Sequence, residues 1–187
     1  MQLRHDKIVL LGDSSVGKTS TIEKFLHGTI PKFCSSTVGA GYSELLLDYH
    51  NSKRKVQIWD TAGQEKSRSM VPIYARNATG AFVVFSLDNK ESFKNIPKWI
   101  SSLKTDAKIV IVGNKCDLPM REVSRRDALE LASKYNAEYI ETSSLTGEGI
   151  TDLFTSMVSS IIDYGENHSP ETSISSLEIE NKRGSCW

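Results

Sequence analysis

The chain has 187 residues and a mass of 20.8 kDa, which suits one domain of ordinary size with a short appendage and excludes a second large core. Charged residues make up 25% of the sequence and hydrophobic residues 39%, which excludes disorder, collagen and coiled coil as descriptions of the whole chain. The 23 basic side chains balance 23 acidic ones, so no overall positive field exists and we expect no nucleic-acid partner.

Short apolar runs alternate with amphipathic stretches of helical length through most of the chain. In chain order they predict a strand over 7–11, a helix over 18–26, strands over 42–48, 55–59 and 80–85, a helix over 91–103, a strand over 108–112, a helix over 124–135, a strand over 138–140 and a helix over 150–162. Apolar runs that do not alternate with polar residues indicate strands buried on both faces, hence a parallel sheet covered by helices.

One pair of strands has no helical stretch between its members. The polar connection from 49 to 54 suits a hairpin, which makes one of the two strands antiparallel to its neighbours. We therefore predict an α/β fold with a mostly parallel six-stranded sheet, one antiparallel edge strand and helices on both faces.

The last part of the sequence has a different character. Residues 165–187 are rich in Ser, Glu and Asn and almost lack apolar periodicity, so they cannot bury enough surface to offset the chain entropy that folding costs. We therefore expect a globular domain over 1–163 and a flexible tail over 164–187.

Neither a membrane span nor a disulfide framework is predicted. The longest apolar runs fall far below the roughly 18 residues that a spanning helix needs. The first residues show no signal-peptide pattern, so we expect the chain to stay in the cytosol.

The three cysteines of the chain, Cys34, Cys116 and Cys186, are far apart and odd in number, which suits neither disulfides nor a zinc site.

A phosphate-binding loop follows the first expected strand. Residues 12–19, GDSSVGKT, match the pattern G-x-x-x-x-G-K-[ST] between a strand and a helix. The glycines permit a loop whose backbone N–H groups point inward at phosphate, and the helix that begins at Lys18 adds its positive end. Lys18 reaches the terminal phosphates, and Thr19 supplies a hydroxyl to Mg²⁺. The nucleotide-binding residues expected here are Asp13, Ser14, Ser15, Val16, Gly17, Lys18, Thr19 and Ser20.

A second motif begins where the 55–59 strand ends. Asp60 stands beside the phosphate loop, where its carboxylate would hold Mg²⁺. Gly63 can bring its amide against a terminal phosphate, and Gln64 is placed to orient an attacking water. A lone glutamine is usually solvated surface, but these neighbours favour the functional interpretation.

The third motif follows the 108–112 strand, at the sheet edge where open α/β folds bind ligands. It contains Asn114, Lys115 and Asp117, and the Asp117 carboxylate can accept two N–H bonds from guanine, whereas adenine has no matching donor pair. Backbone N–H groups of Ser143 and Ser144 could reach the guanine O6. Alone, the pattern N-K-x-D could be a helix-capping loop, but its order after the first two motifs favours a guanine site.

Together with Thr37, these motifs resemble those of the Ras-like small GTPases, and their sequences are most similar to those of the Rab family. The Rab-like sequence motifs are WDTAGQE over 59–65, GNKCDL over 113–118 and TVGA over 37–40. Residues 69–74 resemble the endocytic Rab branch. The resemblance covers roughly residues 6–163. It implies a P-loop NTPase small G domain that switches between GTP and GDP, hydrolyses GTP slowly with Mg²⁺, and regulates vesicle or membrane traffic through effectors.

The resemblance also implies roles for individual residues. Lys18, Thr37 and Gln64 would be catalytic, and Thr37 would join Thr19 and Asp60 as a ligand of Mg²⁺ while GTP is bound. A further set, the aromatic trio that Rab effectors read, falls on Tyr42, Trp59 and Tyr74. Half-buried structural aromatics are the alternative interpretation of that trio.

Partners follow from the same resemblance. No Arg stands near Thr37, so a GTPase-activating protein with an arginine finger is implied, together with an exchange factor. A GDP-dissociation inhibitor or escort protein is implied if the chain is prenylated. We expect a monomer in the cytosol and, through a lipid, on the cytoplasmic face of an internal membrane of endosomal or other vesicular origin.

The C-terminus departs from the family. Rab proteins usually end with two nearby cysteines that take two prenyl chains, whereas this chain offers Cys186 alone and fits no C-a-a-X box. A single lipid gives only weak, reversible anchoring. Single prenylation of Cys186 and a free thiol both remain open.

Five other positions also depart from the family pattern, and they keep a second interpretation open. They are Ile30, where relatives carry an aromatic against the guanine, Cys34 and Ser67 in place of switch aromatics, and Ser144 and Leu145 in place of the Ala and Lys of the base-binding pattern. Phe33 could substitute for the aromatic that is missing at position 30. Ile30, Cys34 and Leu145 motivate a hydrolysis-deficient guanine-nucleotide-binding scaffold. The intact residues Lys18, Thr37, Asp60 and Gln64 argue against it. A small-molecule P-loop kinase is disfavoured, because residues 114–117 have no role in one.

Overall fold

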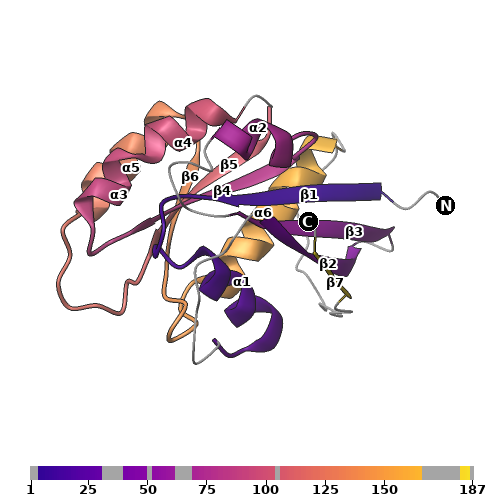
Figure 1. Cartoon of the computed structure of the whole chain (residues 1–187), viewed down its shortest axis with the longest axis horizontal. Helices are drawn as coiled ribbons and strands as arrows, with labels where there is room; N and C mark the ends of the chain where they lie inside the picture. Colours follow the sequence, from indigo (N-terminus) through magenta and orange to yellow (C-terminus); the bar gives the residue numbers. More distant parts are fainter. Residues whose placement is uncertain are drawn as a thin grey trace.

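The computed structural model describes residues 4–30, 40–49, 52–61, 69–103, 106–165 and 182–185. One sheet runs through the molecule with helices on both of its faces (Figure 1). In chain order the elements are β1 (Arg4–Leu11), α1 (Lys18–His27), β2 (Ala40–Tyr49), β3 (Ser52–Thr61), α2 (Val71–Tyr74), β4 (Gly80–Ser86), α3 (Lys90–Lys94), α4 (Ile96–Ser102), β5 (Lys108–Asn114), α5 (Arg125–Lys134), β6 (Glu138–Thr142), α6 (Ile150–Gly165) and β7 (Lys182–Ser185).

The sheet has the strand order β6-β5-β4-β1-β3-β2-β7. The pairs β1 with β3, β1 with β4, β4 with β5 and β5 with β6 are parallel, and β2 lies antiparallel to β3 in the predicted hairpin. The predicted α/β class and its six strands are therefore confirmed. With the parallel strands in register, the loops after β1, β3, β4, β5 and β6 emerge at one edge of the sheet.

The structure adds a seventh strand that the sequence did not predict. Strand β7 pairs antiparallel with β2, from Gly41 opposite Ser185 to Glu44 opposite Lys182. The predicted edge strand β2 is therefore an inner strand over these residues, and β7 forms the edge. The four residues of β7, KRGS, include no apolar side chain, so the sequence pattern of the tail gave no signal for a strand.

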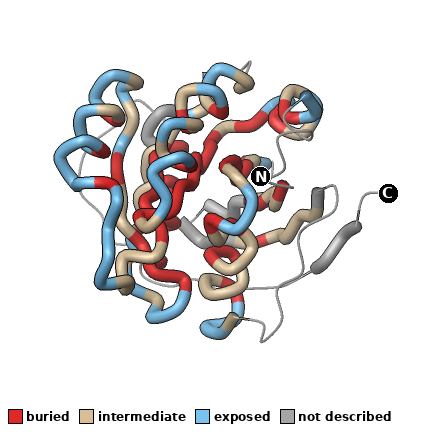
Figure 2. Tube along the Cα trace, turned by 60° about the vertical axis from the view of Figure 1, so that its left-hand side comes forward, coloured by how far each residue is buried: buried red, intermediate tan, exposed pale blue. Residues whose placement is uncertain are grey.

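The core consists of two apolar layers, one on each face of the sheet. Alternate residues of β1 serve the two layers: Ile8 and Leu10 pack toward α1 and α6, while Val9 and Leu11 pack toward α2, α4 and α5. Every residue of β4 is buried, as the unbroken apolar run predicted. Figure 2 shows the buried segments gathered between the helices. None of the helices in the ranges described is long and apolar enough to cross a bilayer.

The helix predicted over 91–103 is divided in two. Helix α3 ends at Lys94 and α4 begins at Ile96, with Asn95 between them. Pro97 lies in the first turn of α4, where its missing N–H costs no hydrogen bond, whereas inside a continuous helix its ring would clash with the preceding turn. The break places Asn95 where its side chain reaches Asp13, in the loop after β1.

Candidate nucleotide site

The loop between β1 and α1 has a conformation that only glycine allows at two positions. Gly12 has φ 141° and Gly17 has φ 98°, both in the region that favours glycine. A Cβ atom at Gly12 would lie 2.1 Å from the Val84 carbonyl oxygen, and one at Gly17 would lie 2.2 Å from Asn114 Nδ2. The loop is therefore a close-fitting backbone cradle at the carboxyl edge of the sheet, ending at the N-terminus of α1.

Lys18 crosses this loop as a buried ammonium group. Its Nζ donates to the carbonyl oxygens of Gly12, at 2.9 Å, and Asp13, at 2.7 Å. Burial lowers the pKa of Lys18 to about 8, against the opposing attraction of the Asp60 and Asp13 carboxylates. The loop thus carries a cation at the position where the sequence predicted contact with terminal phosphates.

Two predicted magnesium ligands lie side by side at the same edge. Thr19 lies in the first turn of α1 and Asp60 is the next-to-last residue of β3. The Thr19 hydroxyl donates to Asp60 Oδ2 at 2.6 Å. A hydroxyl and a carboxylate are the hard oxygen donors that Mg²⁺ takes beside phosphate oxygens. The donor set therefore fits Mg²⁺.

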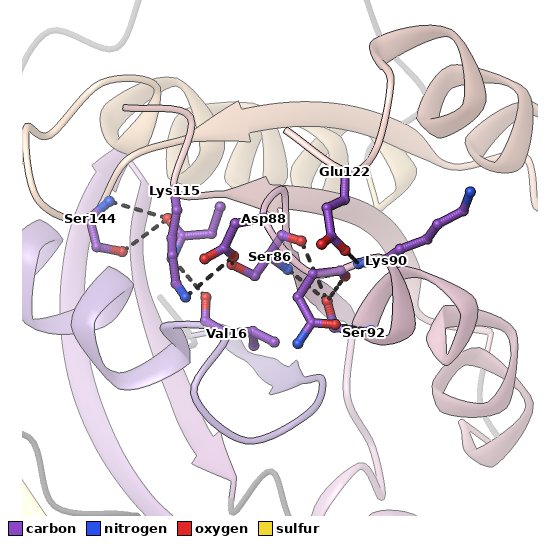
Figure 3. Close-up of polar contacts among 10 residues, drawn as sticks. Val16, Ser86, Asp88, Lys90, Ser92, Lys115, Glu122 and Ser144 are labelled. Atoms are coloured by element: carbon purple, nitrogen blue, oxygen red, sulfur yellow. Dashed lines mark hydrogen bonds and ion pairs between the residues drawn. The ribbon is translucent and has the colours of Figure 1, made fainter. Parts of the chain in front are cut away.

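The side chain of Asn114 joins the phosphate loop to the loop after β6. Its Nδ2 donates to the Val16 carbonyl at 2.8 Å, and its Oδ1 accepts the Thr142 hydroxyl at 3.1 Å. The same Oδ1 accepts the N–H and the hydroxyl of Ser144, both at 3.2 Å. Figure 3 labels Val16 and Ser144, the partners of Asn114 from the phosphate loop and from the loop after β6. Because all its polar atoms are satisfied, Asn114 is a buried structural joint of the site.

Lys115 and Asp117 occupy the same loop with their own partners. Lys115 has φ 67°, and its Nζ lies 3.5 Å from Asp88 Oδ1 (Figure 3). The Ser143 hydroxyl donates to Asp117 Oδ1 at 2.6 Å, so the predicted base-reading carboxylate meets the loop after β6. Leu145, which departs from the family pattern, has 63% of its surface exposed beside this loop.

Asp88 is a site residue that the sequence analysis missed. A hydrogen bond from Ser86, followed by the charge of Lys115, holds the pKa of Asp88 below its ordinary value, although burial acts in the other direction. The carboxylate is therefore ionised at neutral pH and orients Lys115 (Figure 3). The available signal was its position directly after a buried strand, at the same edge as the three motifs.

Two of the three predicted effector aromatics are in contact. Tyr42 on β2 and Trp59 on β3 are directly opposite in register, and their rings stack with centroids 5.3 Å apart. The ammonium of Lys7 lies 4.0 Å from the centre of the Trp59 ring. Tyr74 lies on the short helix α2, where its hydroxyl contacts the sulfur of Met70 at 3.7 Å.

Several predicted residues lie outside the residues that the structure describes. They are Thr37, Gly63, Gln64 and Cys186, together with Phe33, Cys34 and Ser67. Their assigned roles remain predictions. The structure brings together residues that the sequence predicts to bind phosphate, Mg²⁺ and base, around Lys18, Asp60 and Asn114.

The fold and this site define a phosphate-loop nucleotide-binding protein. The Ras family model matches residues 7–163. Similar proteins include Ras-related protein Rab-4 of Dictyostelium discoideum, 37% identical over 168 residues that cover 86% of this chain and 82% of that protein. Human Ras-related protein Rab-22A is 36% identical over 159 residues, 82% of each chain, and Rab-18 of Lymnaea stagnalis is 33% identical over 189 residues, 97% of this chain and 94% of that protein.

The chain therefore belongs to the Ras family of small GTPases, and within that family to the Rab proteins. The predicted class, a Rab-like small GTPase involved in membrane traffic, is confirmed. Membership implies guanine-nucleotide binding and GTPase activity in general. Membership in the family does not favour the alternative, a hydrolysis-deficient scaffold, over the GTPase.

Proposed function

We propose that this protein is a GTP/GDP switch in which loop 12–17, Lys18 and the paired Thr19 and Asp60 hold the phosphates and Mg²⁺. The observation that carries the proposal is the contact between the Thr19 hydroxyl and Asp60 Oδ2, 2.6 Å apart. This pair lies next to a loop whose backbone conformation suits phosphate. When bound, Mg²⁺ would neutralise charge on the phosphate oxygens. The chain's own contribution is to hold that pair and Lys18 at one edge of a rigid sheet.

The hydrolytic step in this proposal uses residues from two segments. Lys18 stabilises charge that develops on the terminal phosphate oxygens, and Gln64 orients the attacking water, with Thr37 completing the metal site while GTP is bound. No arginine lies between residues 30 and 42, so the chain supplies no arginine finger of its own near Thr37. Turnover is slow until a GTPase-activating protein supplies one, and an exchange factor restores GTP.

Guanine selectivity rests on the loops after β5 and β6. Asp117 accepts two N–H bonds from the base, and the short contact from the Ser143 hydroxyl supports the position of that carboxylate. Lys115, oriented by Asp88, lies beside it. Adenine lacks the donor pair, so ATP would desolvate the Asp117 carboxylate without supplying the two N–H bonds that guanine gives, which costs binding free energy.

Effector and membrane binding complete the proposed cycle. The stacked pair of Tyr42 and Trp59 offers effectors a half-buried aromatic surface on β2 and β3, and Tyr74 belongs to the same set. A single prenyl group on Cys186 gives reversible attachment to an internal membrane, endosomal or otherwise vesicular, and makes a GDP-dissociation inhibitor or escort protein a partner.

The proposed switch is tested by the change Gln64→Leu. Single-turnover hydrolysis of bound GTP should fall at least about tenfold, because leucine cannot orient a water. Gln57→Leu is the matched control, since it makes the same chemical change on β3, outside the site. A hydrolysis rate that Gln64→Leu leaves equal to the wild type would favour the hydrolysis-deficient scaffold.

A further inference from the structure

The side chain of Asp13 ties the phosphate loop to the helices on one face of the sheet. Asp13 Oδ1 accepts the indole N–H of Trp99 at 2.7 Å, and Oδ2 accepts the Asn95 side-chain amide at 2.8 Å. These donors come from the break between α3 and α4 and from α4 itself, on the sheet face opposite α1 (Figure 1). Each carboxylate oxygen thus has its own donor, more than 80 residues away in sequence.

Both donors are held in place before they meet the carboxylate. Trp99 is fully buried in the core layer below α4, so its ring cannot turn away without opening that layer. Asn95 is fixed by the helix break, where its backbone N–H donates to the Glu91 carbonyl at 3.1 Å. Hydrogen bonds from fixed donors to an ionised acceptor are among the stronger ones in proteins.

The same residue also touches the phosphate-binding machinery. The Asp13 carbonyl oxygen accepts Lys18 Nζ at 2.7 Å, so the main chain of Asp13 contacts Lys18 while its side chain contacts the helices. The loop holds positive φ angles at Gly12, Ser15 and Gly17, a conformation that persists only when its surroundings support it.

Electrostatics give the contact a second role. A carboxylate in a loop that gathers N–H groups around phosphate would repel that phosphate if it faced the ligand. The two donors hold the Asp13 carboxylate at the helix side of the loop. They therefore both shape the cradle and keep a negative charge directed away from it.

We propose that Asp13, Asn95 and Trp99 form a clasp that sets the phosphate-binding conformation of loop 12–17, with Asn95 and Trp99 as positioning residues for nucleotide retention. The inference rests on the proposed function, since the nucleotide it retains is GDP or GTP. The break between α3 and α4 thus helps to shape the phosphate loop, although it lies more than 80 residues away in the sequence.

The first test measures release of a fluorescent GDP analogue from the full chain. Trp99→Phe keeps an aromatic ring but removes the indole N–H, and Asp13→Ala removes both acceptors. Each should release GDP about tenfold faster, the factor that corresponds to about 1.4 kcal/mol. Because both changes remove one shared contact, the double variant should release GDP no faster than Asp13→Ala alone.

A matched control separates positioning from loss of stability. Ile96→Val removes one buried methyl group from the same helix without touching loop 12–17, and it should lower thermal stability while GDP release stays at the wild-type rate. If Ile96→Val speeds release as much as Trp99→Phe does, or if the effects of Asp13→Ala and Trp99→Phe simply add, the clasp is wrong.

A second readout needs no nucleotide. Amide hydrogen exchange over residues 12–17 should be faster in Asn95→Ala, which removes one surface-side donor and spares the core, than in the wild type. Unchanged exchange there would overturn the clasp even if Trp99→Phe failed to fold. If the chain binds no guanine nucleotide at all, the proposed function fails, while the exchange result still decides whether the clasp holds the loop.

Discussion

Cys116 lies in the loop after β5, between Lys115 and Asp117. Its backbone N–H donates to the Thr142 carbonyl at 3.0 Å, which holds it against the loop after β6. Burial raises the pKa of Cys116 to about 11, and the charge of Glu148 and a hydrogen bond to it act in the same direction. Since only the thiolate is nucleophilic, the folded protein protects this cysteine at neutral pH.

Alkylation of Cys116 by iodoacetamide at pH 8 should therefore be slow. A pKa raised from the reference value of 9.0 to about 11 lowers the thiolate fraction about a hundredfold. The measurement is the labelling rate from peptide mass spectrometry, with an unstructured peptide of residues 113–119 as the control. Glu148→Gln should speed labelling by removing a nearby negative charge. Labelling of the folded protein as fast as the free peptide would contradict this account.

The sequence predicted some of these residues and not others, for a physical reason. Lys18, Asp60 and Asn114 belong to short motifs whose spacing follows from one loop or one strand end, so a single pass along the chain finds them. Asp88, Asn95 and Trp99 act through partners from other elements. No local pattern encodes such contacts, and only the register of the sheet and the packing of α4 bring them together.

In the loop that joins β1 to α1, replacing Gly17 by alanine should destabilise the protein. In Gly17→Ala the new methyl group would meet the Asn114 amide and break its bond to Val16, in addition to the strain of a positive φ. Gly28→Ala at the end of α1 carries the strain alone, because φ is 68° there and nothing lies within 4 Å of its Cβ position.

Urea unfolding of the two variants separates these contributions. Gly28→Ala should lower the free energy of unfolding by about 1 to 2 kcal/mol, the cost of a left-handed alanine. Gly17→Ala should lower it by about 1 to 3 kcal/mol more, the cost of a buried polar group left without its partner. Equal losses in the two variants would mean that Asn114 does not pack against the loop as described.

Element prediction succeeded where burial dictates sequence and failed where backbone geometry decides. The unbroken apolar run of β4 could only be a strand buried on both faces, and it is one. The 91–103 stretch has a helical pattern throughout, yet Pro97 divides it. Strand β7 contains no apolar residue, so no alternation of apolar and polar residues marked it in the sequence.

The seventh strand changes the outline of the whole sheet, and its removal is testable. In a chain that ends at residue 181, the outer edge of β2 over residues 41–44 loses its partner strand. Amide hydrogen exchange in a peptide spanning these residues should become faster, while exchange in β6 at the opposite edge of the sheet stays the same. Unchanged exchange at 41–44 would contradict the pairing of β7 with β2.

Considered as a whole, the molecule assembles its site at the carboxyl ends of five parallel strands, along one edge of the sheet. The phosphate loop, Asp60, Asp88, Asn114 and Ser144 come from separate stretches of the chain, and the parallel register of the strands brings them together. The buried bridge from Asn114 to Val16 and Ser144 makes the phosphate and base regions one unit. A guanine nucleotide would span both regions.

The most direct test of this account is the identity of the bound nucleotide. The full chain, purified with Mg²⁺ present, is denatured, and the released nucleotide is identified and quantified by ion-pair chromatography. We predict close to one GDP or GTP per chain, which would also show that Ile30 and Leu145 are compatible with guanine binding. An adenine nucleotide, or a protein purified with an empty site, would contradict it.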